Sequence, residues 1–173
     1  MNIHTSTKQH GFTIVELLIV IVVIGVLAAI TIVSYTATQN RSKTTSALSS
    51  ATNTATKAEI YSANSSSSVY PDTPSTLTGA ATSQPYQLSG VTFTPSALST
   101  APANPSVLAF YRCGVRATGN NTAPTTTGQI AKTTGVRINY WSWTDNNGNS
   151  HVSAGTTSGT VGTQHVGCVF VAP

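Results

Sequence analysis

Glu16 is the residue whose type and setting most clearly indicate a function. It is the only ionisable side chain between Phe12 and Val33, where almost every other residue is apolar. A carboxylate costs about 2.5–3.5 kcal/mol at the middle of a bilayer, so an acid retained in such a run is expected to be functional. One turn into a helix, it also gains from the positive end of the helix dipole. The alternative is a tolerated acid that extends to the membrane interface.

No other arrangement of side chains indicates catalysis. Serine, histidine and aspartate all occur, but no Gly-x-Ser-x-Gly elbow or comparable setting surrounds them. The histidines fit ordinary polar residues and lie at His4, His10, His151 and His165. The sequence therefore predicts a protein that is not an enzyme and that uses no cofactor.

Asp145, Asn147 and Asn149 alternate like the oxygen ligands of a calcium loop. The downstream Glu of such a loop is missing and few acids are nearby, so we favour a plain hairpin turn and no metal. Asn147-Gly148 in particular predicts a turn with positive φ.

Cys113 and Cys168 lie far apart, and neither has another Cys or a His at metal-ligand spacing. In an exported chain we expect them to form a disulfide. Closing a loop of about 55 residues would contribute roughly 3–4.5 kcal/mol in the chain-entropy model. Two buried free thiols are the alternative.

The composition is poor in charge. Charged residues make up 7% of the chain, against about 25% in a typical globular domain, which suggests a secreted or cell-surface protein. The net charge of +4 is spread out and is not by itself a nucleic-acid footprint. Trp141 and Trp143 are expected on one face of a strand, with Tyr140 on the other, and core packing or subunit contact is favoured over stacking on sugars or bases. If the chain does bind a ligand or DNA, the candidate contacts are Arg112, Arg116, Lys132 and Arg137.

A single long helix must position Glu16. At 1.5 Å per residue, residues 12–33 span about 33 Å, enough for a hydrocarbon core of about 30 Å. Beyond Thr36 the sequence turns polar, but Leu48, Ala51, Ala55 and Ala58 recur at spacings of three and four. That spacing predicts one narrow helical face, and we expect the helix to continue to about Ala63.

The remaining chain predicts a loop followed by a sheet. Prolines punctuate residues 64–105, where Val91–Phe93 is expected to form a brief strand. The last third contains β-branched and aromatic runs at Val107–Val115, Val136–Trp143 and Val166–Val171, with His151–Ala154 as a returning strand. The Thr-rich stretch 117–134 is expected to be an exposed loop. We predict an α+β fold in which an antiparallel meander of three to five strands packs on the amphipathic half of the helix.

The polar segment 1–11 precedes the apolar run and resembles a targeting n-region. Its small residue, Gly11, comes before the apolar core rather than after it. A cut at Gly11 would therefore leave the apolar segment on the mature protein as an anchor.

The residues Gly-Phe-Thr-Ile-Val-Glu-Leu-Leu-Ile-Val at 11–20 resemble the prepilin motif of type IV pilins and pseudopilins. The long helix, Tyr70-Pro71, the late sheet and the two cysteines resemble that family more loosely. The resemblance implies cleavage between Gly11 and Phe12 by a prepilin peptidase, N-methylation of Phe12, and pairing of Glu16 with the amine of a neighbouring subunit.

The resemblance also implies an organisation and partners. Residues 1–11 would be the leader, 12–35 the transmembrane and filament-core half of the helix, 36–63 its amphipathic half, and 64–173 a globular pilin head. Before assembly the protein would cross the membrane once, with its N-terminus in the cytoplasm and its head outside; it would then join an extracellular pilus.

Its partners would be other copies, minor pilins and an inner-membrane assembly platform. The main hypothesis is a structural pilus subunit. The alternative is a minor pilin or a secretion or DNA-uptake pseudopilin whose head binds DNA, a surface or a secreted substrate.

Overall fold

The computed structural model describes residues 11–79, 84–116, 124–161 and 164–173, without the side chains of residues 164 and 165. The chain divides into two compact units, residues 1–39 and residues 40–173. Helix α1 (Ile14–Asn64) belongs to both, and each unit is treated by itself. The helix ends within one residue of the predicted end.

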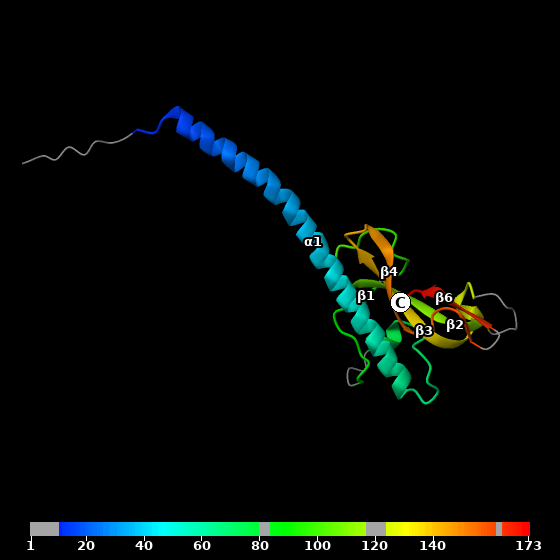
Figure 1. Cartoon of the computed structure of the whole chain (residues 1–173). Coiled ribbons are helices and arrows are strands. Elements are labelled where there is room, and N and C mark those ends of the chain that lie inside the picture. Colours follow the sequence, from blue (N-terminus) through cyan, green and yellow to red (C-terminus); the bar gives the residue numbers. More distant parts are fainter. Residues whose placement is uncertain (1–10, 80–83, 117–123, 162–163) are drawn as a thin grey trace, which may run out of the picture. The chain divides into compact units, whose positions relative to one another are not determined.

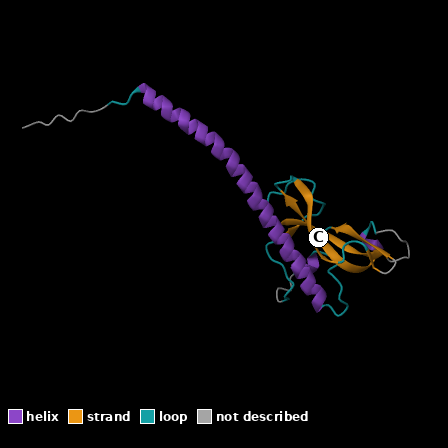
Figure 2. Cartoon of the chain, viewed as in Figure 1, coloured by secondary structure: helices purple, strands orange, loops and turns teal. Residues whose placement is uncertain are grey.

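The second unit contains the remaining elements, which Figures 1 and 2 show as short helices and a twisted sheet. In chain order they are α2 (Ser75–Thr78), β1 (Thr92–Phe93), β2 (Val107–Arg116), the 3-10 helix η1 (Thr127–Gln129), β3 (Ile130–Ser142), β4 (Asn147–Gly155), β5 (Thr160–Val161) and β6 (Gln164–Val171). The predicted α+β, pilin-like layout of a long N-terminal helix and a C-terminal sheet is confirmed.

The sheet is not a simple meander. Its strand order is β4-β3-β2-β6-β5, so β2 lies in the middle and pairs with both β3 and β6. These pairings are antiparallel, whereas β1 pairs with the start of β2 in parallel. The last strand therefore returns to β2 rather than continuing outward from β4.

The main core lies between α1 and one face of the sheet. The helix contributes small side chains, and the sheet contributes Leu108, Phe110, Val136 and Ile138, all fully buried. Since alternate residues of a strand point to opposite faces, the odd-numbered neighbours on β2 and β3, such as Tyr111 and Arg137, point away from the helix. We call the face that carries them the outer face.

The buried stripe of α1 differs in one residue from the predicted stripe. Ala51, Ala55 and Ala58 are buried as expected, but Leu48 is 41% exposed and Ala47 is buried in its place.

The turn between β3 and β4 also differs from the prediction. The positive φ falls on Asn146 at 50°, and Gly148 lies inside β4. A Cβ on Gly148 would lie 2.2 Å from the backbone oxygen of Leu98, so this glycine permits close backbone approach. Trp143 lies in the turn rather than on the strand, and its backbone N–H donates to Thr44 Oγ1 at 3.0 Å.

The predicted exposed loop 117–134 is wrong over its second half, while residues 117–123 lie outside the described part. Residues 127–129 form η1, and β3 begins at Ile130. Ile130 and Thr133 are both buried, and the first residues of β3 pair with the end of β2.

Candidate functional site

The helix start around Glu16 is closed by reciprocal hydrogen bonds with Thr13. The backbone N–H and the hydroxyl of Thr13 donate to Glu16 Oε2 at 2.9 and 2.8 Å, and the Glu16 N–H donates to Thr13 Oγ1 at 3.2 Å. This is a capping box, which supplies partners for the free N–H groups of a helix start. The carboxylate is thereby held at the N-terminal end of α1.

Thr13 is the functional residue that the sequence reasoning missed. Its signal was present, because Thr13-Ile14-Val15-Glu16 has the Thr-x-x-Glu spacing of a capping box ahead of an apolar run. Gly11 and Phe12 precede it outside any helix or strand, and Phe12 is 83% exposed. Residues 1–10 of the predicted leader lie outside the described residues.

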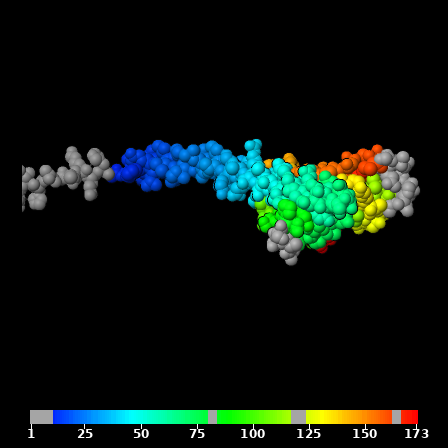
Figure 3. Space-filling model, turned by 90° about the horizontal axis from the view of Figure 1, so that it is seen from below, coloured from blue at the N-terminus to red at the C-terminus, as the bar shows by residue number. Residues whose placement is uncertain are grey.

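The apolar half of α1 is bare. Every side chain from Phe12 to Val33 is exposed, and in Figure 3 this segment (blue) is a single uncovered helix. In the described part of the chain, α1 is the one helix that is long and apolar enough to cross a membrane. Such a surface requires lipid or other apolar helices around it.

The two cysteines are joined. Cys113 on β2 lies directly opposite Cys168 on β6, and a disulfide connects them. The bridge packs with Val115 and Val166 in a small second core on the outer face. It therefore fastens the last strand to the middle of the sheet.

The four candidate contact residues do not come together. Arg112 and Arg116 alternate onto the face that carries Phe110, whereas Lys132 and Arg137 pair with Val115 and Tyr111 on the outer face. The Arg112 side chain also has several polar partners within the chain. Its Nε lies 3.1 Å from Asp72 Oδ1 and donates to Thr133 Oγ1 at 2.8 Å, and its Nη2 donates to the Ile130 carbonyl at 3.3 Å.

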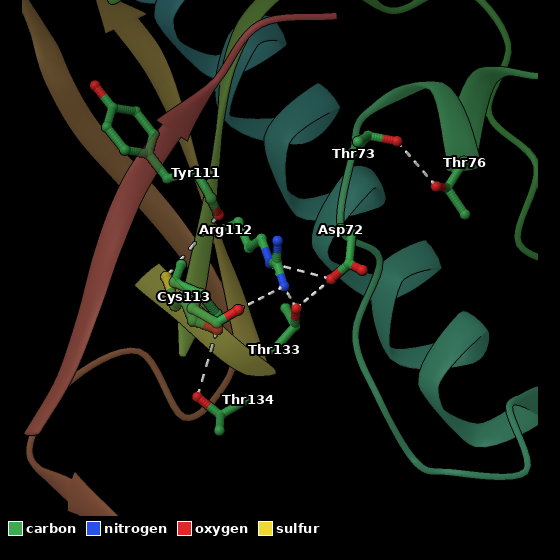
Figure 4. A network of polar contacts seen from close by, with 9 residues as sticks. Asp72, Thr73, Thr76, Tyr111, Arg112, Cys113, Thr133 and Thr134 are labelled. Carbon is green, nitrogen blue, oxygen red and sulfur yellow. Dashed lines mark hydrogen bonds and ion pairs between the residues drawn. The ribbon is translucent and has the colours of Figure 1, made fainter. Parts of the chain in front are cut away.

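Figure 4 shows this polar network on the helix side of the sheet, with Tyr111 pointing to the opposite side. Thr133 also donates its hydroxyl proton to Asp72, which completes a triangle with Arg112. Asp72 belongs to the segment that follows Tyr70-Pro71. The network therefore ties that segment to β2 and β3.

Other predicted sites have ordinary surroundings. Trp141 is 5% exposed, so it is packed and offers no stacking surface. Asp145 accepts a hydrogen bond from Ser142 Oγ at 2.6 Å and belongs to the hairpin turn. His151 is exposed on β4, while His4, His10 and the His165 side chain are outside the described part. Among the described residues, no group of three His, Cys, Asp or Glu side chains could hold a metal ion.

Comparison with protein families finds one match. Residues 6–32 match the model of the prokaryotic N-terminal methylation motif, which is the signature of type IV pilins and pseudopilins. Comparisons with curated proteins and with solved structures found no match. The match contains Gly11, Phe12, Thr13 and Glu16, the residues that form the helix start described above.

Proposed function

From the type IV pilin and pseudopilin signature at residues 6–32, we propose that this protein is a filament subunit that polymerises through its N-terminal helix. A prepilin peptidase would cut between Gly11 and Phe12 and methylate the new N-terminus at Phe12. The observation that carries the proposal is Glu16, the one ionisable side chain in the bare apolar half of α1.

The helix start suits a subunit that lies in the membrane as a monomer before assembly. In lipid, an unpaired carboxylate is costly and backbone N–H groups need internal partners. The Thr13 capping box and the positive end of the helix dipole reduce both costs for the monomer. Residues 12–35 would span the bilayer, with the N-terminus in the cytoplasm and the disulfide-bonded head outside.

Assembly would exchange lipid for other helices. The bare apolar side chains of α1 would pack against those of neighbouring subunits in the filament core. The Glu16 carboxylate would meet the Phe12 amine of a neighbour, and an ion pair in this dry setting is stronger than one in water. Residues 40–63 would support the head, as their buried alanines already do here.

The test is the substitution Glu16→Ala, with Glu16→Gln as its isosteric form. We expect normal membrane insertion, measured by resistance to alkaline extraction, and at least about a tenfold loss of sheared filament, since a lost buried ion pair costs more than about 1.4 kcal/mol. Glu59→Ala is the matched control, because Glu59 is an exposed acid on the head half of the same helix. Normal filament yield from both Glu16 variants would refute the proposal.

The abundance of the chain in sheared filaments separates the two roles within the family. A major subunit should dominate the filament, whereas a minor pilin or pseudopilin should be present at a small fraction. Quantitative mass spectrometry of sheared filaments measures this fraction directly.

A further inference from the structure

Two cations on α1 follow shortly after its apolar run. Arg41 and Lys43 come soon after Val33 in the sequence, and both side chains are exposed. The sequence has no acid between Glu16 and Glu59, so no neighbour along this stretch offsets their charge. Neither cation has an ion pair or a side-chain hydrogen bond in the described part of the chain.

The position of these cations is unusual for a membrane protein. Lys and Arg are normally concentrated on the cytoplasmic flank of a membrane span. Arg41 and Lys43 instead lie on the flank that the proposed topology places outside, whereas one cation, Lys8, precedes the span. Two exposed cations on the outer flank indicate a negatively charged partner on that side.

A turn of the sheet contacts the helix next to these cations. The backbone N–H groups of Trp143 and Thr144 both donate to Thr44 Oγ1, at 3.0 and 3.3 Å. Thr44 directly follows Lys43, so the β3–β4 turn meets α1 where the two cations are. Trp143 is half-buried, so part of its side chain remains on the surface. We call Arg41, Lys43 and Trp143 the helix–turn patch.

The helix–turn patch has the composition of a membrane–water interface. Tryptophan is enriched at that level because its indole ring is apolar and also carries an N–H donor. The Cα–Cβ bonds of a helix tilt toward its N-terminus, so the side chains of Arg41 and Lys43 incline toward the apolar run. If the span ends at Tyr35, Arg41 follows it by about 9 Å of helix rise. Its side chain can then reach back to the headgroup layer, which is about 5–7 Å thick on each side of the hydrocarbon core.

One acid lies near the patch. Asp145 belongs to the same turn and is exposed. Its Oδ2 accepts a hydrogen bond from Ser142 Oγ at 2.6 Å, which holds the carboxylate toward its own turn. Two cations against one acid leave this end of the head positive.

We propose that the helix–turn patch binds anionic phospholipid headgroups of the outer leaflet. Arg41 and Lys43 would contact lipid phosphates, and Trp143 would lie at the level of the headgroups. A cation near an anionic membrane surface strengthens the attraction by about fivefold. The contact would hold the head against the bilayer while the subunit is a monomer, and it would break when the subunit leaves for a filament. The inference rests on the proposed function for the membrane-spanning role of α1.

The experiment places the full chain in nanodiscs of phosphatidylcholine with increasing fractions of phosphatidylglycerol and a fixed fraction of headgroup-spin-labelled lipid. The label quenches nearby tryptophans, and Trp143 is the more accessible of the two because Trp141 is 5% exposed. We expect quenching to rise with the phosphatidylglycerol fraction. The rise should disappear in about 1 M salt, where the Debye length is only about 3 Å.

Substitution of either cation should weaken this lipid dependence. Arg41→Ala and Lys43→Ala should each raise the phosphatidylglycerol fraction needed for half of the full quenching by about fivefold. Arg41→Lys keeps the charge and should behave like the wild type. Lys132→Ala is the matched control, because it removes an exposed cation from β3 and should shift nothing. Trp143→Phe should remove the lipid-dependent part of the signal, and circular dichroism verifies that each variant is folded.

Three results would overturn the inference. One is wild-type quenching that does not change with the phosphatidylglycerol fraction. Another is a shift in Lys132→Ala as large as that in Arg41→Ala, which would mean that the overall charge of the chain attracts the lipid. A third is lipid-dependent quenching that persists in Trp143→Phe, which would place the contact away from the turn.

Alkaline extraction of vesicles of the same composition tests insertion separately. A chain that resists extraction but gives any of these three results overturns the inference and leaves the proposed function standing. A wild-type chain that is extracted would instead refute the membrane-spanning helix, and the proposed function would fail with it.

Discussion

Asp72 and Arg112, forty residues apart in the chain, form an ion pair in which Oδ1 lies 3.1 Å from Nε. The arginine side chain is 17% exposed and the aspartate 60% exposed. The pair joins the segment after Tyr70-Pro71 to the central strand β2, and Thr133 bonds to both partners. A surface acid thus holds a nearly buried cation in place.

The two halves of this pair should contribute unequally to stability. Arg112→Ala leaves Thr133 and the Ile130 carbonyl without their donor, so we expect a loss of about 1.5–3 kcal/mol in the free energy of unfolding. Asp72→Asn removes an exposed charge and should cost about 0–1 kcal/mol. Urea unfolding of the full chain in detergent, followed by tryptophan fluorescence, measures both; equal losses would contradict the unequal roles. Lys132→Ala is the control and should stay within about 0.5 kcal/mol.

The disulfide should matter more than any single polar contact. Cys113 and Cys168 are 55 residues apart, so their bridge removes about 4 kcal/mol of loop entropy from the unfolded chain in the chain-entropy model. We expect the double variant Cys113→Ala with Cys168→Ala to lose about 3–4 kcal/mol. The loss is measured from the urea midpoints of the wild type and the double variant, converted to free energy with one common slope of unfolding free energy against urea concentration. A change below about 1 kcal/mol would show that the unfolded chain is little constrained by the bridge.

Much of the fold could be predicted because its signals are local. The apolar run and the alanine spacing predicted α1 to within one residue of its end at Asn64. The β-branched runs predicted β2, the core of β3, and β6. The polar run Asp145–Asn149 predicted a turn between β3 and β4, although the positive φ falls on Asn146. The helix start at Glu16 was also readable, although its partner Thr13 was overlooked.

What could not be predicted depends on contacts between distant segments. The ion pair of Asp72 with Arg112 leaves no local pattern, and it helps to explain why the Thr-rich start of β3 is strand rather than loop. The split of the basic residues between two faces depends on strand register. The closeness of Gly148 to Leu98 likewise follows from tertiary packing alone.

Gly148 should not tolerate a larger side chain. A Cβ there would lie 2.2 Å from the Leu98 oxygen and 2.6 Å from the Leu98 Cβ, so the loop must move. We expect Gly148→Ala to cost about 1–3 kcal/mol, as overpacking usually does. Gly128→Ala is the matched control, because a Cβ there meets nothing within 4 Å. If urea unfolding gives the same value for both variants, the contact with Leu98 is not a constraint.

Tyr70 should make the head less stable in alkali. Burial raises the pKa of the Tyr70 phenol, and the negative charge of Glu59 raises it further. The folded state therefore keeps the proton more tightly than the unfolded chain, whose tyrosine titrates near about pH 10. The stability from this group is fully present below about pH 10 and is lost as the pH rises above it. Urea midpoints across this range should fall less steeply for Tyr70→Phe and for Glu59→Gln than for the wild type; identical profiles would refute the role of Tyr70.

Cleavage at Gly11 should depend on the size of that residue and not on the fold. A Cβ at Gly11 or at Gly25 meets nothing within 4 Å, so neither glycine is required by packing in the described chain. We expect Gly11→Leu to accumulate as an uncut precursor that retains residues 1–11, because a bulky side chain would not fit a peptidase that recognises a small residue. Gly25→Ala should be cut normally and should yield a mature chain that begins at Phe12 with one added methyl group. Mass spectrometry of the N-terminal peptide distinguishes these products, and a Phe12 N-terminus from Gly11→Leu would refute the predicted dependence of cleavage on the size of residue 11.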